Sequence, residues 1–443
     1  MTPSREEIRQ LARGDLDDAD ARRVLRSLLG VASGMADSTG EGPAPMTGWR
    51  RDPEPEYGPA FERAAAGARA AASRREREEA RTSALLEELT ALPFERQLDL
   101  VRSEARFASA PLVEQLCARS RALAGARPEQ AEHLARLAVA VAEQLVAGGK
   151  GRRSVRDVVA FARGQLGDAL RVRGELREAG VALRQAAEDL AAGSGEPLAS
   201  ARLASLRASL LNDLGRVEQA VALCRDATSQ LRRVGARQAL GRGLVKLAAF
   251  AAALGRFAES LEALGEAAEL VDGSREPRLG LALRHNRAYC LERMGRYREA
   301  ARELAAARAL AEEAGSGIDL ARVRWVEGRV ALGLGRQAQA ENVFREVAAD
   351  FVEAGLSFDA ALVALELALV LLHRGETREV RELAERMVPI FGAQGIHAEA
   401  RAALELFRAA AAREALGGAF VVGLLAYLER ARDRPDLRFE PTG

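Results

Sequence analysis

The side chains that most often carry catalysis or bind metals are few in this chain and lie far apart. They are His133, His285, His373 and His397, together with Cys117, Cys224 and Cys290. No histidine or cysteine pair has the spacing of a zinc site, and no glycine-rich loop follows a strand-like segment. The contexts that metal, nucleotide or nucleophile chemistry requires are therefore missing. We expect a protein that is not an enzyme and that has no metal site and no cofactor.

Charge and cysteine usage narrow the class of partner and the compartment. The chain has 65 basic and 64 acidic residues, a net charge of +1, so its overall charge gives no reason to expect nucleic acid or a membrane as partner. The three cysteines are widely separated, which is not typical of a disulfide framework. No apolar run reaches the length of a membrane-spanning helix, and the first residues do not resemble a secretion signal. We expect a soluble cytoplasmic protein.

The strongest pattern in the chain is a series of evenly spaced glycines. A fixed period of about 40 residues is typical of stacked units, each of which cannot bury its apolar face alone. Aromatic residues make up only 4% of the chain while Ala and Leu are abundant, which favours closely packed helices over strands. The sequence therefore predicts an all-α array. The glycines of this first column are Gly174, Gly215, Gly255, Gly295, Gly335 and Gly375.

Further columns appear when the units are aligned on these glycines. Small residues stand seven before the glycine, small to medium residues five and twelve after it, and apolar residues nine after it. This pattern predicts a hairpin in which helix A ends at the glycine and small side chains let helix B approach closely. We expect the apolar column to pack into the next unit. The column seven before the glycine is Gly167, Ala208, Ala248, Ala288, Gly328 and Ala368.

The turns between the helices resemble those of the tetratricopeptide repeat. The segments LGRVEQA (214–220), LGRFAES (254–260), MGRYREA (294–300) and LGRQAQA (334–340) carry this likeness. The resemblance implies a right-handed superhelical α-solenoid of hairpins, with a period longer than the family's usual one. Arg207 and Arg287 stand where the repeat normally has Leu. A second glycine column, Gly235, Gly315, Gly355 and Gly395, is expected to mark the turn into the next unit.

Composition divides the rest of the chain. We expect a small helical segment over 1–35, a Pro- and Gly-rich linker over 36–60, a helical extension of the array over 61–150, six repeats over 151–395, a capping hairpin over 396–434 and a tail over 435–443. The first segment resembles the zinc-binding domain of bacterial anti-sigma factors. At the ligand positions that this likeness implies, the chain has Ser27, Ala32 and Met35, which cannot bind zinc, so we expect a degenerate segment without metal.

The resemblance to tetratricopeptide proteins also implies where a partner binds. In that family helix A lines the groove, which places the groove-facing residues thirteen, ten, six and three before each glycine. The last unit has only leucines there, and we expect Leu362, Leu365, Leu369 and Leu372 to be buried against the C-terminal cap. The candidate binding residues are Arg202, Asn212, Arg242, His285, Tyr289, Glu292, Arg322, Trp325 and Arg329.

Three functional hypotheses remain open at this point. The first is a non-enzymatic scaffold or adaptor, acting in bacterial regulation, that binds a peptide or protein partner in the groove. Recurring arginines could pair with carboxylates of such a partner, and Tyr289 and Trp325 would add flat apolar contact. The second is a regulator that senses a ligand or peptide. The third is a structural subunit that stacks end to end. The sequence does not determine the partner or the oligomeric state.

Overall fold

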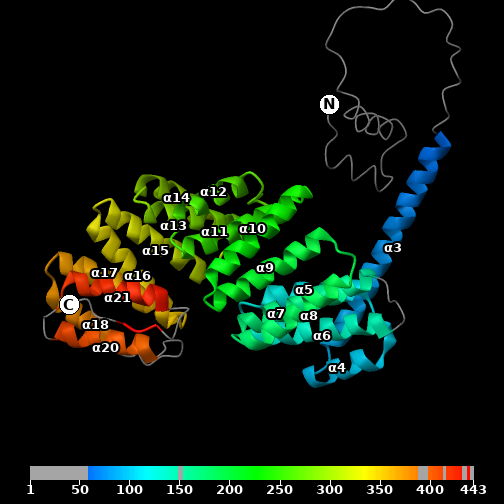
Figure 1. The fold of residues 1–443 in the computed structure, drawn as a ribbon, viewed down its shortest axis with the longest axis horizontal. Helices are drawn as coiled ribbons and strands as arrows, with labels where there is room; N and C mark the ends of the chain where they lie inside the picture. Colours follow the sequence, from blue (N-terminus) through cyan, green and yellow to red (C-terminus); the bar gives the residue numbers. More distant parts are fainter. Residues whose placement is uncertain (1–57, 148–152, 388–397, 413–415, 432–436, 440–443) are drawn as a thin grey trace, which may run out of the picture. The chain divides into compact units, whose positions relative to one another are not determined.

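A computed structural model describes residues 58–147, 153–387, 398–412, 416–431 and 437–439. The predicted segment 1–35, its positions Ser27, Ala32 and Met35, and nearly all of the linker lie outside these residues. The described residues contain helices and no strand, which confirms the all-α class (Figure 1). None of their helices is long and apolar enough to cross a membrane. The helices are α3 (Gly58–Thr90), α4 (Phe94–Ser103), η1 (Ala105–Phe107), α5 (Ala110–Leu123), α6 (Pro128–Ala147), α7 (Arg153–Val172), α8 (Leu176–Ala191), α9 (Pro197–Asp213), α10 (Val217–Arg233), α11 (Arg237–Ala253), α12 (Phe257–Ala268), α13 (Pro277–Arg293), α14 (Tyr297–Ala314), α15 (Gly317–Gly333), α16 (Gln337–Glu353), α17 (Ser357–His373), α18 (Thr377–Arg386), α20 (Ala398–Ala412) and α21 (Gly418–Ala431).

The chain divides into two compact units, and the boundary along the sequence falls between Leu116 and Cys117, within α5. In the first unit α3 packs on α4, and Arg106 pairs with both Glu88 and Glu104. This division falls inside the segment 61–150, which the sequence suggested as an extension of the array. The domain boundaries that we expect from composition remain predictions.

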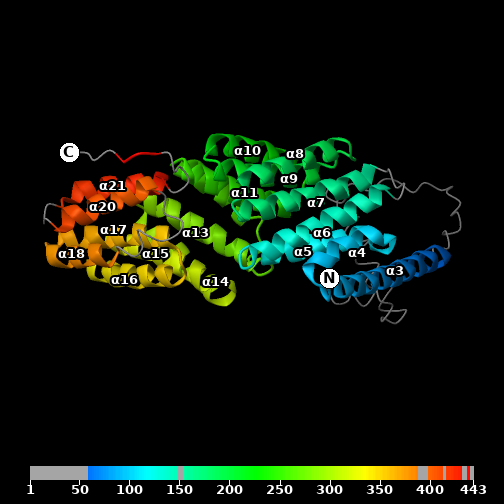
Figure 2. The same cartoon turned by 90° about the horizontal axis from the view of Figure 1, so that it is seen from below.

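The second unit contains the six predicted hairpins. Helix A and helix B of each repeat pack on each other in the pairs α7/α8, α9/α10, α11/α12, α13/α14, α15/α16 and α17/α18. Each helix B also packs on the next helix A, and successive A helices such as α9, α11, α13 and α15 contact one another (Figure 2). Because every unit is covered by its neighbours, the buried apolar residues form successive clusters, each of which spans helices of adjacent units. The all-α array of stacked hairpins expected from the glycine period is confirmed, and with it the α-solenoid that the resemblance of the turns to the tetratricopeptide repeat implied.

The first glycine column ends helix A in each repeat, as predicted. Gly215 has φ 71°, and its N–H and that of Arg216 donate to the carbonyls of Asn212 and Leu211, which closes the last turn of α9. All six glycines of this column have φ between 71° and 85°. In the second column Gly315 differs, because its φ is −83° and Ser316 begins α15 with a capping box to Asp319. Gly395 lies outside the described residues.

The small column seven before the glycine lies where the two helices of a hairpin cross. A Cβ added to Gly167 would come within 2.6 Å of Leu183, and one added to Gly328 within 2.5 Å of Phe344. Leu183 and Phe344 belong to the apolar column nine after the glycine. At these positions the apolar column contacts the small column of its own hairpin. Leu183 also shares a core cluster with Leu203 and Leu210 of the next unit, toward which we had expected this column to pack.

The C-terminal helices close the array differently from the regular units. α20 packs on α18, while α21 packs on α17. Leu362 and Leu365 of α17 are buried, and Leu369 and Leu372 pack partly buried against the same core, as predicted from the leucine-rich segment. The helix α21 contributes Val421, Leu424 and Leu428 to this core. The last helix A is therefore covered by the chain's own C-terminal helix.

Candidate partner-binding face

We use the term A face for the side of the A helices formed by residues thirteen, ten, six and three before each glycine. The structure brings six of the nine candidate residues near one another, on α13 and α15. The charges of Arg322 and Arg329 both act to lower the pKa of His285, and that of Arg329 also acts to lower the pKa of Glu292. Arg202, Asn212 and Arg242 lie on α9 and α11, at other levels of the array.

Trp325 and Arg329 are held by carboxylates of the protein itself. The indole Nε1 of Trp325 donates to Glu366 Oε2 at 2.8 Å, and Arg329 Nε donates to Glu366 Oε1 at 2.6 Å. Arg329 also lies 3.4 Å from Glu429, which α21 brings to the same place. The neighbouring carboxylates raise the pKa of Arg329 although burial opposes this. The charge of Arg329 is therefore neutralised within the molecule.

Trp325 also belongs partly to the core. Its ring meets Phe351 edge to face, with centroids 5.7 Å apart, and the guanidinium of Arg329 lies 4.8 Å from the ring centroid. These contacts and the hydrogen bond to Glu366 fix the orientation of the indole. Among the candidates, Trp325 and Arg329 thus have the most internal contacts.

The residues His285, Tyr289 and Glu292 follow one another along one face of α13. Their spacing of four and three residues places them on the same side of the helix. Nδ1 of His285 and Oε2 of Glu292 are buried and have no hydrogen-bond partner among the described residues. Tyr289 contacts Phe257 edge to face at 6.1 Å. We name these three residues the α13 stripe.

Burial shifts the titration of every member of the α13 stripe toward its neutral form. It lowers the pKa of His285 to about 4, and the nearby Arg322 acts in the same direction. Burial raises the pKa of Glu292 and that of Tyr289, although Arg293 and Arg329 oppose it in both cases. At neutral pH the stripe therefore offers a neutral imidazole, a phenol, and a carboxyl group that takes up a proton more readily than usual.

The remaining candidates differ in how far they are engaged. Arg322 and Arg202 are exposed and form no ion pair with other described residues. Arg242 Nε lies 2.7 Å from Glu276 Oε2 at the start of α13, and Asn212 Nδ2 donates to Asp213 at 3.3 Å. Arg322 is thus an exposed cation without an ion pair among the described residues, and it lies close enough to the α13 stripe to lower the pKa of His285.

A column that the sequence analysis did not use proves to join successive A helices. It lies nine residues before the glycine and includes Lys246 and Glu366. Lys246 Nζ donates to Ser205 O at 3.2 Å and to Ser209 Oγ at 3.0 Å, as Glu366 accepts from Trp325 and Arg329. The sequence could have pointed to this column, since the glycine alignment places Lys246, one of only two lysines in the chain, at this position.

Three carboxylates could in principle hold a metal ion. One oxygen each of Glu341, Glu376 and Glu379 lies within 4.8 Å of the others. Arg345 contacts Glu341 at 2.8 Å and Glu379 at 2.6 Å, while Arg374 pairs with Glu341 and contacts Glu376 at 2.6 Å. Two guanidinium groups thus neutralise most of the negative charge, so we interpret the group as an ion-pair network between α16 and α18.

Comparison with solved structures places the fold among helical-repeat proteins. The chain is similar to a Rap protein complexed with competence and sporulation factor, with a TM-score of 0.50 and 15% identity over 64% of this chain and 77% of that one. It is also similar to aspartyl phosphate phosphatase F from Bacillus subtilis (TM-score 0.49, 14% identity, 88% of this chain and 93% of that one) and to the apo form of RapI (0.42, 13%, 72% and 98%). No family model and no curated protein matches the chain. At these identities the likeness concerns the fold alone.

Proposed function

We propose that this protein is a non-enzymatic interaction scaffold or adaptor that binds a peptide or protein partner on the A face, centred on α13 and α15. The residues that contact the partner are the α13 stripe and Arg322. Trp325 and Arg329 belong to the same face, but Glu366 and Glu429 fix their positions, so they order the face instead of binding the partner directly. Arg202, Asn212 and Arg242 extend the face toward the earlier repeats.

The observation that carries this proposal is the lack of hydrogen-bond partners along the α13 stripe. A buried polar atom without a partner costs about 1–3 kcal/mol, and Nδ1 of His285 and Oε2 of Glu292 are two such atoms on one helix face. His285 and Glu292 are both partly exposed, so a rotation of the side chain can bring each buried atom to an extended peptide. The alternating N–H and C=O groups of such a peptide can supply partners to both. Binding would therefore recover free energy that the isolated protein lacks.

Charge and shape beside the stripe indicate the chemistry of the partner. The exposed guanidinium of Arg322 can form a forked pair with a carboxylate of the partner. Tyr289 lies against Phe257 and offers a ring edge for apolar contact. We therefore favour a partner segment with at least one acidic side chain or a free C-terminal carboxylate.

The surroundings of the cysteines support a role without catalysis. Cys224 and Cys290 are buried, and burial raises the pKa of Cys224 to about 11 and also raises that of Cys290. Thiols in such surroundings are poor nucleophiles. A Rap protein of similar fold has been solved with competence and sporulation factor, so a helical-repeat protein of this kind can hold a partner.

The proposal can be tested by affinity capture with the full chain as bait and quantitative mass spectrometry as readout. We expect Arg322→Glu and Tyr289→Ala each to lower the yield of the same partner at least about tenfold, which corresponds to about 1.4 kcal/mol. The matched control is Arg302→Glu, an equal change of charge at an exposed position of α14. Circular dichroism checks that all variants keep their helices.

Two results would contradict the proposal. One is a partner captured equally well by the wild type and by both A-face variants. The other is a partner whose yield falls as much with Arg302→Glu as with Arg322→Glu, since charge alone would then explain its binding.

A further inference from the structure

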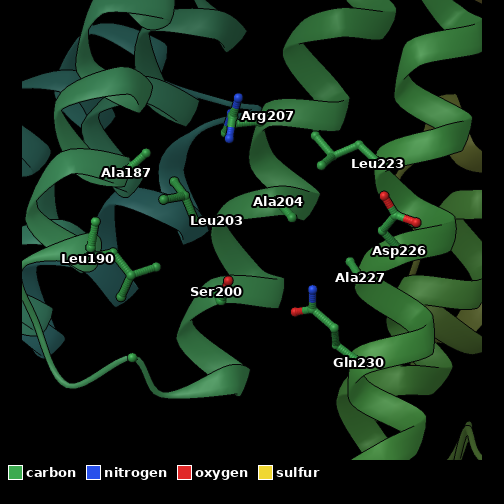
Figure 3. Close-up of a pocket in the computed structure, with 12 residues that line it drawn as sticks. Ala187, Leu190, Ser200, Leu203, Ala204, Arg207, Leu223, Asp226, Ala227 and Gln230 are labelled. Atoms are coloured by element: carbon green, nitrogen blue, oxygen red, sulfur yellow. The ribbon is translucent and has the colours of Figure 1, made fainter.

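A second candidate site lies between the B helices α8 and α10, over α9. A cavity of about 390 Å³ opens there, and Figure 3 shows the side chains that line it. On α9 the cavity side and the A face are opposite each other. Leu203 and Arg207 point to the cavity, whereas Ser205 and Ser209 lie roughly half a turn away. The cavity is therefore distinct from the proposed partner-binding face.

The cavity is present where Arg207 replaces a leucine of the repeat. Eight residues before the glycine, two other units have Leu247 and Leu367, and both are buried. Arg207 is exposed instead, and the space beside it is not filled. This is the position that departed from the tetratricopeptide pattern in the sequence.

Arg207 also differs from the other charged residues of its column. Arg287 Nε donates to Glu303 at 2.9 Å, and Glu327 pairs with Arg308. Arg207 has no ion pair with any described residue, although it lines the cavity. Its guanidinium is thus available to a ligand.

Asp226, on the other side of the cavity, likewise lacks the ion pair that its counterparts in other repeats form. Eleven residues after the glycine, Glu266 contacts Arg232 at 2.7 Å and Glu346 pairs with Arg324. Asp226 forms no such pair within the described part of the chain. In Figure 3 Arg207 and Asp226 stand apart across the opening, with Ala204 and Leu223 between them.

We propose that this cavity binds a small zwitterion with an aliphatic side chain, either a free amino acid or a short peptide. Arg207 would pair with the carboxylate of the ligand and Asp226 with its ammonium group. The amide of Gln230 offers a further hydrogen bond, and Leu190, Leu203 and Leu223 would contact the aliphatic side chain. The volume lies within the range of small-molecule sites. A ligand there would bridge two successive repeats, because α8 belongs to one hairpin and α9 and α10 to the next.

The test uses the full chain with L-leucine and L-leucyl-L-leucine as separate probes, measured by saturation-transfer NMR and by titration calorimetry. We expect at least one of the two to bind with a Kd of about 1 mM or tighter, and the comparison shows whether the source is an amino acid or a peptide. Leucinamide, which lacks the carboxylate, and 4-methylpentanoate, which lacks the ammonium group, should each bind at least about tenfold more weakly.

The variant Arg207→Leu restores the residue of the neighbouring units, so we expect it to fold and to lose binding. Asp226→Asn should weaken binding of the zwitterion and leave that of 4-methylpentanoate unchanged. The control Glu266→Gln, at the equivalent position of the next unit, should bind as the wild type does. The proposal is overturned if neither probe binds, if Arg207→Leu binds as well as the wild type, or if leucine binds and leucinamide matches it.

Discussion

The residues Lys246 and Glu366 occupy the same position in two repeats, yet they stabilise their surroundings in different ways. Both stand nine before the glycine and contact residues 41 and 37 positions earlier, on the preceding helix A. Lys246 donates to two neutral oxygens of α9. Glu366 accepts from the indole of Trp325 and from the guanidinium of Arg329, which is itself charged.

The two residues differ in how their removal would affect the charges around them. Around Lys246, Arg171 contacts Asp213 at 2.7 Å and Asp168 at 2.9 Å, so each of these carboxylates keeps a cationic partner without the lysine. Around Glu366, the side chain of Arg329 is only 13% exposed and depends on carboxylates for its neutralisation. A position of the repeat therefore fixes which helices are joined, while the neighbours decide how much the contact stabilises.

The largest effect should come from Glu366→Gln. We expect the free energy of unfolding to fall by about 3 kcal/mol, because the buried charge of Arg329 loses its main partner. Urea denaturation followed by circular dichroism measures this loss. As a control, Glu266→Gln breaks an exposed pair with Arg232 and should cost less than about 1 kcal/mol. Equal losses in both variants would show that burial of Arg329 does not matter.

A second prediction concerns the pH dependence of stability in the region of Glu366, where Arg329 and Arg322 help to lower the pKa of His285. Because the folded pKa of His285 is about 4 and its unfolded value is near 6.5, the unfolded chain binds more protons between these values. The stability contributed by neutral His285 is present above about pH 6.5 and is lost as pH falls toward 4. When the pH falls from about 7 to about 5, the free energy of unfolding of His285→Gln should therefore rise by about 1–2 kcal/mol relative to that of the wild type.

Glu292 acts in the opposite sense, so the comparison with the His285 variant is needed to isolate the histidine. Burial raises the folded pKa of Glu292. The stability contributed by its protonated form is therefore present below the unfolded pKa and is lost as pH rises toward the folded pKa. Denaturation curves of wild type and His285→Gln at both pH values give the difference directly. A constant difference would mean that His285 takes up its proton equally well in the folded protein.

The smallest effect is expected for Lys246→Met. Methionine keeps the aliphatic stem of the side chain, and Ser209 Oγ still donates to Ser205 O at 3.2 Å. Burial lowers the pKa of Lys246, which shows that the folded protein does not hold its charge strongly. We expect a change below about 1 kcal/mol in the same urea assay. A loss as large as that of Glu366→Gln would remove the distinction between the two regions.

Much of the fold could be predicted from residue spacing. The glycine columns located the helix ends because a positive φ suits glycine best, as Gly215 shows. The small columns located the helix crossings, where Gly167 leaves room only for Leu183. The burial of Leu362 and Leu365 against the C-terminal helices was also predicted, from the leucines at the groove positions of the last unit. What the spacing did not reveal was that α21 and not α20 covers α17, and that α21 brings Glu429 to Arg329.

The candidate site could be predicted less well, because a helix position fixes the face on which a residue lies but not its partners. Trp325 and Arg329 were predicted to face a partner, and the structure shows that their side chains are engaged by Glu366, which is 37 or more residues away. The same limit hid the cavity at Arg207. The sequence showed an arginine in a leucine column, while the absence of a pairing carboxylate became evident only in three dimensions.

The sequence by itself determined the period, the helix ends and the crossing points, since these depend on backbone conformation and side-chain size within one hairpin. The tertiary structure decided which charges are paired, which polar atoms stay without partners and where space is left unfilled. These properties depend on neighbours from other repeats, and solvation and electrostatic forces act through distances in space that a linear pattern does not contain.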